Sequence, residues 1–206
     1  MKIATRTLLV LFCFSVICVS EPYANSDAKG FTSGAEKFVE SLANSAISSL
    51  TNQTLTQKER QNNFRGLLRD YFDINGIGKW ALGRYWRKAS QKERTEYLEL
   101  FENLIVGTYS NRFNAYSDEK LLVKGSTSRG RFALVRSLLN RDDQKPIRID
   151  WRVTQPDGNY KIFDIIVEGV SMIQTQRSEF SSVIRRNGGN VSGLLAALRK
   201  KVNKAN

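Results

Sequence analysis

Histidine is absent from the 206-residue chain, and both of its cysteines, Cys13 and Cys18, lie near the N-terminus. The lack of histidine removes the most frequent general base, the commonest metal ligand and every serine–histidine or cysteine–histidine nucleophile. Enzymatic chemistry would therefore depend on carboxylates, lysine or tyrosine. Beyond residue 18 the chain can form no disulfide, so a hydrophobic core must hold the fold together.

The start of the chain has the pattern of a secretory signal peptide. Two basic residues precede an apolar run at residues 8–19, and small residues follow it. The run is too short to span a bilayer as a helix. We expect residues 1–24 to be a signal peptide, cleaved between residues 20 and 28, and residues 25–206 to form the mature protein. The alternative is an N-terminal helix that stays in the membrane.

Basic residues clearly outnumber acidic ones, with 32 Lys and Arg against 20 Asp and Glu and a net charge of +12. An exported protein with this charge meets membranes and anionic partners. Alternatively, the charge serves solubility alone. The segment at residues 79–88 combines aromatic and basic residues, as a nucleic-acid platform or a helix end can. Because export disfavours nucleic acid, we expect salt-dependent docking through Lys79, Arg84, Arg87 and Lys88 instead.

The first half of the chain has helical periodicity, and three helices are predicted to begin with a reciprocal capping box, in which Ser or Thr precedes Glu by three residues. The three boxes are Ser33/Glu36, Thr56/Glu59 and Ser90/Glu93. They predict helices near residues 34–50, 57–72 and 91–114, after a polar tail that ends at residue 30. Asp73 as N-cap and Gly83 as a stop predict a further short helix.

In the middle of the chain, apolar and polar residues alternate with the period of two that is typical of strands. The predicted strands are Leu121–Lys124, Phe132–Leu139, Ile147–Val153 and Tyr160–Val167. Turn-rich segments separate them, at residues 125–130, 142–143 and 156–159. Loops this short join antiparallel neighbours, and the alternation of apolar and charged residues in the third strand indicates one covered face and one wet face.

Two further helices, near residues 170–186 and 191–202, are predicted to close the chain. No long linker interrupts these elements. The sequence therefore predicts a single α+β domain, in which about six helices cover one face of a four-stranded antiparallel meander.

The main candidates for catalytic residues are Asp164 and Glu168, because both carboxylates lie on one face of the fourth predicted strand. Four residues along a strand separate them by roughly 13 Å, which is too far for a glycosidase pair. We expect Asp164 to pair with Arg148 or Arg152 on a neighbouring strand, and Gly169 to turn the chain into the next helix. The alternative is a small isomerase-like or hydrolase-like enzyme that uses Asp164 or Glu168.

Three stretches of the sequence resemble a known family. They are DYFDINGIGKWALGRYWRKAS at residues 70–90, ERTEYLELFENLIVGTYSNRF at residues 93–113 and WRVTQPDGNYKIFDIIVEGVSMIQTQRSEF at residues 151–180. The most specific block is IFDIIVEGVS at residues 162–171, where Phe163 replaces a tyrosine of the family pattern. In these stretches the chain is similar to the MlaC, or toluene-tolerance, family of periplasmic phospholipid-binding proteins of Gram-negative bacteria.

The resemblance implies a periplasmic carrier that shuttles phospholipid between outer-membrane and inner-membrane complexes, is linked to an ABC transporter and catalyses nothing. Its implied partners are a phospholipid ligand and membrane-anchored lipid-transfer proteins of both membranes. We expect a monomer with neither cofactor nor metal and no nucleic-acid partner. A docking or adaptor protein without a cavity is a further alternative.

The same resemblance implies an apolar pocket between sheet and helices that holds the acyl chains. We expect its wall to come from the covered sheet face and the long helix. The candidate residues are Ala133, Val135, Ile149, Trp151, Phe163 and Ile165 from the sheet and Phe101, Ile105 and Tyr109 from the helix. Each can instead belong to the core, because apolar periodicity alone does not separate the two roles.

Overall fold

The computed structural model describes residues 24–110, 119–141 and 144–205. The bulk of the predicted signal peptide, both cysteines, the turn at residues 142–143 and the predicted helical residues 111–114 lie outside these ranges. No helix within the described ranges is both long enough and apolar enough to cross a membrane.

The fold is α+β, as predicted, with an antiparallel sheet. The helices are α1 (Ala24–Leu50), α2 (Gln57–Tyr71), α3 (Ile74–Leu82), α4 (Tyr85–Lys88), α5 (Gln91–Tyr109), α6 (Met172–Arg186) and α7 (Val191–Ala205). The strands are β1 (Lys120–Arg129), β2 (Phe132–Arg141), β3 (Gln144–Thr154), β4 (Lys161–Val167) and β5 (Val170–Ser171). They form one meander in the order β1-β2-β3-β4-β5.

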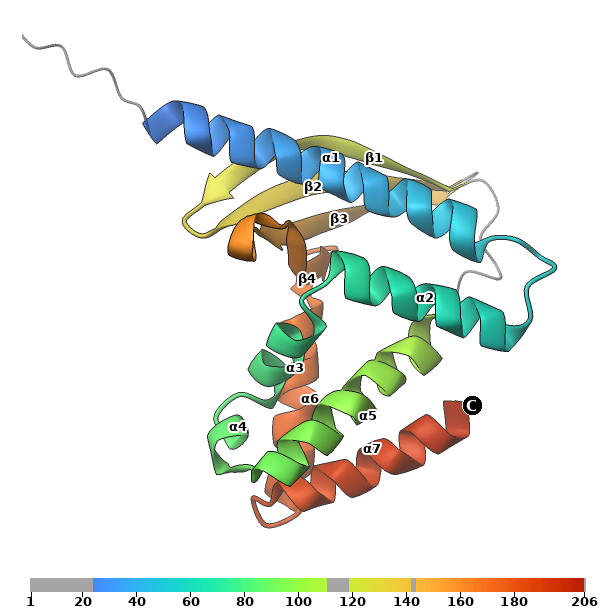
Figure 1. Ribbon diagram of the computed structural model, residues 1–206, viewed down its shortest axis with the longest axis vertical. Helices are drawn as coiled ribbons and strands as arrows, with labels where there is room; N and C mark the ends of the chain where they lie inside the picture. Colours follow the sequence, from blue (N-terminus) through green and yellow to red (C-terminus); the bar gives the residue numbers. More distant parts are fainter. Residues whose placement is uncertain (1–23, 111–118, 142–143, 206) are drawn as a thin grey trace, which may run out of the picture.

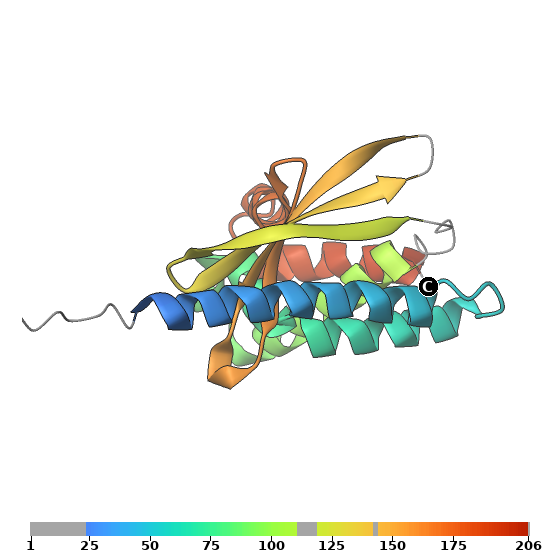
Figure 2. The ribbon, with the colours of Figure 1, turned by 90° about the horizontal axis from the view of Figure 1, so that it is seen from above.

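The described elements form two parts (Figure 1). Helix α1 packs against β1 and β2, whereas α5 packs chiefly against α7 and less against α2 and α3. Seen from above, α1 runs alongside the sheet, and α2 runs beside α1 (Figure 2). Helices α3 and α6 contact β4, which ties the helical part to the sheet.

Several helix ends form where the sequence predicts them. Thr56 and Ser90 each accept a hydrogen bond from the backbone of the glutamate three residues on, and both boxes are reciprocal. The Asp73 side chain accepts from the Gly76 N–H as the N-cap of α3. Gly83 ends α3 with φ +58°, a conformation that favours glycine.

The prediction for the first helix is wrong at its start. Helix α1 begins at Ala24, so Ser33 lies inside it and the predicted Ser33/Glu36 capping box does not form. The Glu36 carboxylate instead accepts a hydrogen bond from Ser126 Oγ at 2.6 Å. Contacts with the sheet support the added turns, because the Phe31 ring stacks on Tyr160, whose hydroxyl donates to the Phe31 carbonyl.

The sheet also differs from the prediction in two places. Residues 125–129, predicted as a turn, continue β1 after a bulge between Val123 and Gly125, and Gly125 has φ +121°. Val170 and Ser171, predicted as helical, pair with β4 as a fifth strand. The sheet therefore has five strands instead of four. Helix α5 ends at Tyr109, and the short helix α4 has no counterpart in the prediction.

Candidate functional site

The apolar interior is divided into two clusters. The first, called here the sheet cluster, lies between α1 and the sheet. Its buried members are Ala35, Val39, Leu42, Ala133, Val135, Trp151, Val153 and Ile162. Partly buried hydrophobic residues pack against it, among them Phe38, Tyr71, Ile149 and Ile165. Within the described chain, these partly buried residues are as numerous as the buried ones.

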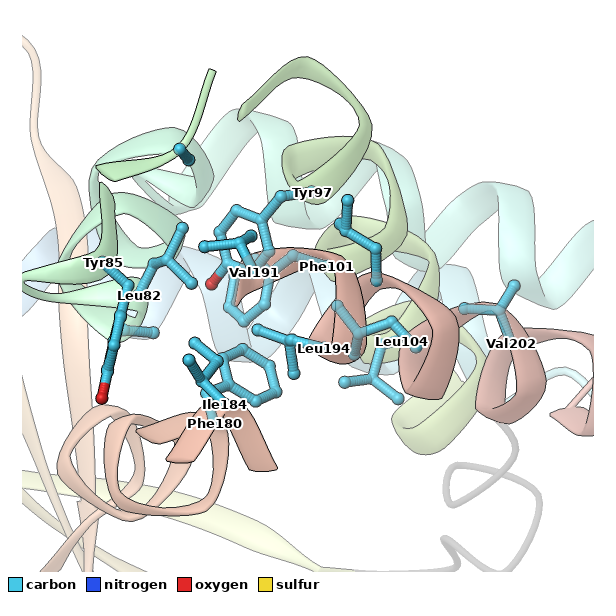
Figure 3. Packing of buried hydrophobic residues seen from close by; sticks show 14 of the residues in the cluster. Leu82, Tyr85, Tyr97, Phe101, Leu104, Phe180, Ile184, Val191, Leu194 and Val202 are labelled. Atoms are coloured by element: carbon cyan, nitrogen blue, oxygen red, sulfur yellow. The ribbon is translucent and has the colours of Figure 1, made fainter. Parts of the chain in front are cut away.

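The second cluster, called here the helix cluster, is built from α2 to α7 (Figure 3). Its centre is aromatic: the Phe101 ring stacks on Tyr97 at 5.9 Å and meets Phe180 edge-on at 6.1 Å between centroids. The Tyr97 hydroxyl donates to the Gly78 carbonyl at 2.9 Å, and burial raises the pKa of this phenol well above its usual range. Buried members of this cluster clearly outnumber partly buried ones, so it is a closed core.

Phe72, which packs against both clusters, marks the joint between them. It bridges to Ile162 of β4, and the next N–H, of Asp73, donates to the Ile162 carbonyl at 3.1 Å. The Lys161 ammonium donates to the carbonyls of Arg69 and Asp70 near the end of α2. These contacts fix α2 and α3 to the sheet, which sets the separation of the two clusters.

The nine predicted wall residues fall on both sides of this division. The sheet cluster contains Ala133, Val135, Ile149, Trp151 and Ile165, whereas Phe101, Ile105 and Phe163 belong to the helix cluster. Tyr109, at the end of α5, is half-buried. The predicted wall residues are therefore divided between the two clusters and do not form one surface.

Their burial also differs. Ala133 and Val135 are 0% exposed and Phe101 is 1% exposed, which leaves them almost no surface in this arrangement. Ile105, Ile149 and others of the nine are half-buried and keep free apolar area. The half-buried set is Ile105, Tyr109, Ile149, Phe163 and Ile165.

The polar end of Trp151 is satisfied inside the sheet. Its indole N–H donates to Ser137 Oγ at 2.9 Å, and that hydroxyl donates to the Ile149 carbonyl at 2.7 Å. The surface of β2 and β3 around Trp151 is therefore hydrocarbon, because Trp151 has no free hydrogen-bond donor. Such a surface can bind an apolar group, and it offers little to a polar substrate.

Asp164 holds a structural junction. Its carboxylate accepts from Arg152 at 2.8 Å, from Ser171 Oγ at 2.7 Å and from the Ile173 N–H at 3.1 Å. Its side chain is 0% exposed. Pairing with Arg152 confirms the structural interpretation made from the sequence. Three donors already occupy the carboxylate, which suits anchoring the start of α6 better than accepting a substrate proton.

Glu168 serves the turn between β4 and β5. It has φ +48° and Gly169 has φ +84°, the left-handed pair of a two-residue hairpin turn. Its carboxylate accepts from the Arg148 N–H. The two carboxylates therefore do separate structural work, although they lie on one short segment.

Comparison with known proteins identifies the family. The family model described as MlaC protein matches residues 40–200. The chain belongs to the MlaC family. It is 24% identical over 140 residues to the intermembrane phospholipid transport system binding protein MlaC of Haemophilus influenzae, and 22% identical over 135 residues to the toluene tolerance protein ttg2D of Pseudomonas putida. These alignments cover 64% and 65% of this chain and 65% and 63% of the two relatives.

The fold of this MlaC-family chain matches a solved structure. The phospholipid-binding protein from Ralstonia solanacearum, solved in complex with a phospholipid, superposes with a TM-score of 0.76 at 20% sequence identity. The match covers 83% of this chain and 98% of that one.

Sequence reasoning missed part of the surroundings of the sheet cluster. The Tyr71 hydroxyl lies 3.0 Å from Ser41 Oγ and 2.8 Å from Ser45 Oγ, which ties α2 to α1. The Tyr71 ring packs on Phe38 with centroids 5.2 Å apart. Phe38 and Tyr71 occupy apolar positions of their helices, and helical periodicity alone does not indicate that they meet. The small residues Ser41 and Ser45, spaced four apart, were the signal that a polar side chain docks there.

Proposed function

We propose that this MlaC-family protein is a periplasmic phospholipid carrier whose ligand lies between the sheet cluster and the helix cluster. The observation that carries the proposal is the family match over residues 40–200. The fold match to a protein solved with a phospholipid supports it. The half-buried apolar residues that pack against the two clusters suit a hydrocarbon ligand.

The wall is proposed to consist of the half-buried members of the predicted set, with Trp151 beside them. Ala133, Val135 and Phe101 are proposed to be core, because side chains with almost no exposed surface offer a ligand nothing to contact. Ile149 and Ile165 would then line the sheet side, and Ile105 and Phe163 the helix side. Tyr109, the last residue of α5, would lie at one end of this wall.

The energetics of acyl chains explain why such a ligand needs a carrier. Two chains hold on the order of 30 methylenes, and at about 0.8 kcal/mol each their exposure to water would cost roughly 24 kcal/mol. Such a lipid does not cross water unaided at a useful rate. It must pass directly between the protein and a membrane or a membrane-anchored partner.

We further propose that the partners are membrane-anchored lipid-transfer proteins of the inner and outer membranes, linked to an ABC transporter. The protein would act as a monomer and catalyse no reaction. In support, Asp164 and Glu168 are occupied by structural hydrogen bonds. Location in the periplasm rests on the predicted signal peptide and on the family.

Denaturing extraction of the purified mature protein, followed by mass spectrometry of the extract, tests the carrier function. We expect phospholipid in near-stoichiometric amount. Protein that is stripped of lipid in denaturant and refolded should take up added phospholipid from vesicles. A protein that purifies empty and also refuses added phospholipid would contradict the proposal.

A further inference from the structure

Some cations of the described chain are neutralised by an ion pair, and others are not. Arg65, Arg69, Arg148, Arg152 and Arg199 each form an ion pair with a carboxylate. Many other cations form no ion pair with a described carboxylate, and six of these lie on α3, α4 and α6 and the segment between α3 and α4. This group, called here the cationic face, consists of Lys79, Arg84, Arg87, Lys88, Arg177 and Arg185. All are exposed except Arg177, which is half-buried.

Acidic residues are scarce around the cationic face. Residues 74–90 contain no Asp or Glu, although they include four of the six cations. Helix α6 has one acidic residue, Glu179, whose carboxylate accepts from the Gln176 amide. Among the described residues, no carboxylate forms an ion pair with these six cations.

Aromatic rings lie beneath most of these cations. The Arg177 guanidinium lies 4.6 Å from the Trp80 ring centroid, and the Lys79 ammonium lies 5.9 Å from that of Trp86. Arg84 and Lys88 lie 5.1 Å and 5.9 Å from the Tyr85 ring. Trp80 and Trp86 are only partly buried, so cations and aromatic surface are offered together.

Cations from the α4 region and from α6 both act on the Tyr85 hydroxyl. Arg84 donates to it at 3.2 Å, and the hydrogen bond together with the charges of Arg84, Arg185 and Lys88 lowers the pKa of this phenol. Arg185 comes from α6 and the other two cations from the region of α4. Cations far apart in the sequence therefore gather on one side of the helical part.

We propose that the cationic face docks the protein on the anionic surface of a phospholipid membrane. Lipid phosphates are dispersed over a surface, so they suit exposed cations spread over several elements, each worth about 1 kcal/mol near such a surface. Partly exposed tryptophans add to this, because their rings favour the membrane–water interface. The inference deepens the proposed function, since a carrier whose ligand cannot cross water has to reach a membrane.

Vesicle co-sedimentation of the mature protein tests the docking surface. Vesicles of phosphatidylcholine with one-third phosphatidylglycerol are compared with pure phosphatidylcholine. The double variant Arg84→Gln/Lys88→Gln removes two charges from the cationic face. The matched control Lys120→Gln/Lys124→Gln removes two exposed charges from β1. Thermal midpoints establish that each variant folds, and Arg87→Gln/Arg185→Gln is the substitute if the first does not.

Binding to the anionic vesicles should exceed binding to neutral ones and weaken with salt. At about fivefold per cation, the cationic-face variant should bind roughly 25-fold more weakly at low salt, and the β1 control much less so. Equal loss in both variants would reduce the effect to net charge and overturn the proposal. So would the absence of binding to anionic vesicles, which would assign the face to an acidic protein partner.

The lipid content of the same preparations separates this proposal from the carrier function. Protein that carries phospholipid but ignores anionic vesicles leaves the carrier standing and removes the docking surface. Protein that binds the vesicles through the cationic face but never takes up phospholipid would contradict the carrier function and leave the docking surface standing.

Discussion

The helix cluster and the sheet cluster solve the burial of apolar side chains in different ways. In the helix cluster, aromatic rings from α5 and α6 interlock, and Tyr97, Phe101 and Phe180 are all 3% exposed or less. In the sheet cluster, α1 covers β1 and β2, whereas many apolar residues around it keep part of their surface. One cluster has a close-packed aromatic centre, and in the other a larger share of the apolar residues keeps part of its surface.

This difference suggests a division of labour. A closed aromatic core makes the helical part a stable wall without any ligand. The half-buried surface of the sheet side can gain further burial only from an added apolar group. We infer that stability resides mainly in the helix cluster and ligand affinity mainly in the surface that faces it. Substitutions in the two clusters should therefore have different consequences.

Truncation of Phe101 should give the largest loss of stability. Phe101→Ala removes a ring that is 1% exposed and contacts both Tyr97 and Phe180, and such losses cost about 3–5 kcal/mol of unfolding free energy. Urea unfolding of delipidated protein measures it. Leu122→Ala, at a side chain 39% exposed on β1, is the control and should cost under about 1 kcal/mol. A small loss at Phe101 would show that the helix cluster is not close-packed.

Asp164→Asn should come next, because it weakens the junction that joins β4 to α6. The carboxylate is fully buried, but Arg152 is 37% exposed and water can solvate it, so we expect a loss of about 1–3 kcal/mol instead of the full cost of a buried unpaired charge. Lipid content should not change. The exposed Asp157→Asn in the turn before β4 is the control. Loss of lipid at unchanged stability would instead move Asp164 into the ligand site.

Val135→Trp tests the part of the sheet cluster that we assign to the core. Val135 is 0% exposed, so a larger ring forces strain of roughly 1–3 kcal/mol. The thermal midpoint of delipidated protein should fall, while the folded fraction still takes up phospholipid. If the midpoint holds and the lipid disappears, Val135 belongs to the wall after all.

The smallest effect is expected outside both clusters, at the start of α2. Hydrogen bonds from the Thr56 side chain and backbone lower the pKa of Glu59 below its usual value of 4.5. A lowered folded-state pKa stabilises the fold above the unfolded-state pKa, and this stabilisation is lost as the pH falls through the folded-state value. Between about pH 6 and pH 3, wild type should therefore lose slightly more thermal stability than Glu59→Gln. An identical pH profile for both would contradict the capping role.

Local signals made much of this fold predictable. Thr56, Ser90 and Asp73 cap helices through side chains within three residues, so their sequence neighbourhood suffices. The Asp164–Arg152 pair followed from strand alternation and short loops, which bring the two strands together. The predicted N-cap at Ser33 was wrong because α1 begins before it. Contacts with Tyr160 and Ser126, which are far along the chain, stabilise these earlier turns.

The wall was predictable in composition but not in arrangement. Period-two alternation places Val135, Ile149 and Trp151 on one face of the sheet. It does not indicate which part of that face α1 buries. That depends on which strands α1 crosses, and α1 lies over β1 and β2. Likewise, Phe101 satisfies the helical pattern of a wall residue, and only its contacts with Tyr97 and Phe180 place it in the core.

The lipid content of Ile149→Trp tests the proposed ligand position most directly. Ile149 is half-buried on β3 and belongs to the surface that we assign to the acyl chains. In native mass spectrometry, the bound phospholipid of this variant should fall several-fold, while the thermal midpoint of the delipidated variant stays at or above that of delipidated wild type. A variant that unfolds early yet carries as much phospholipid as wild type would show that Ile149 is core and that the ligand lies elsewhere.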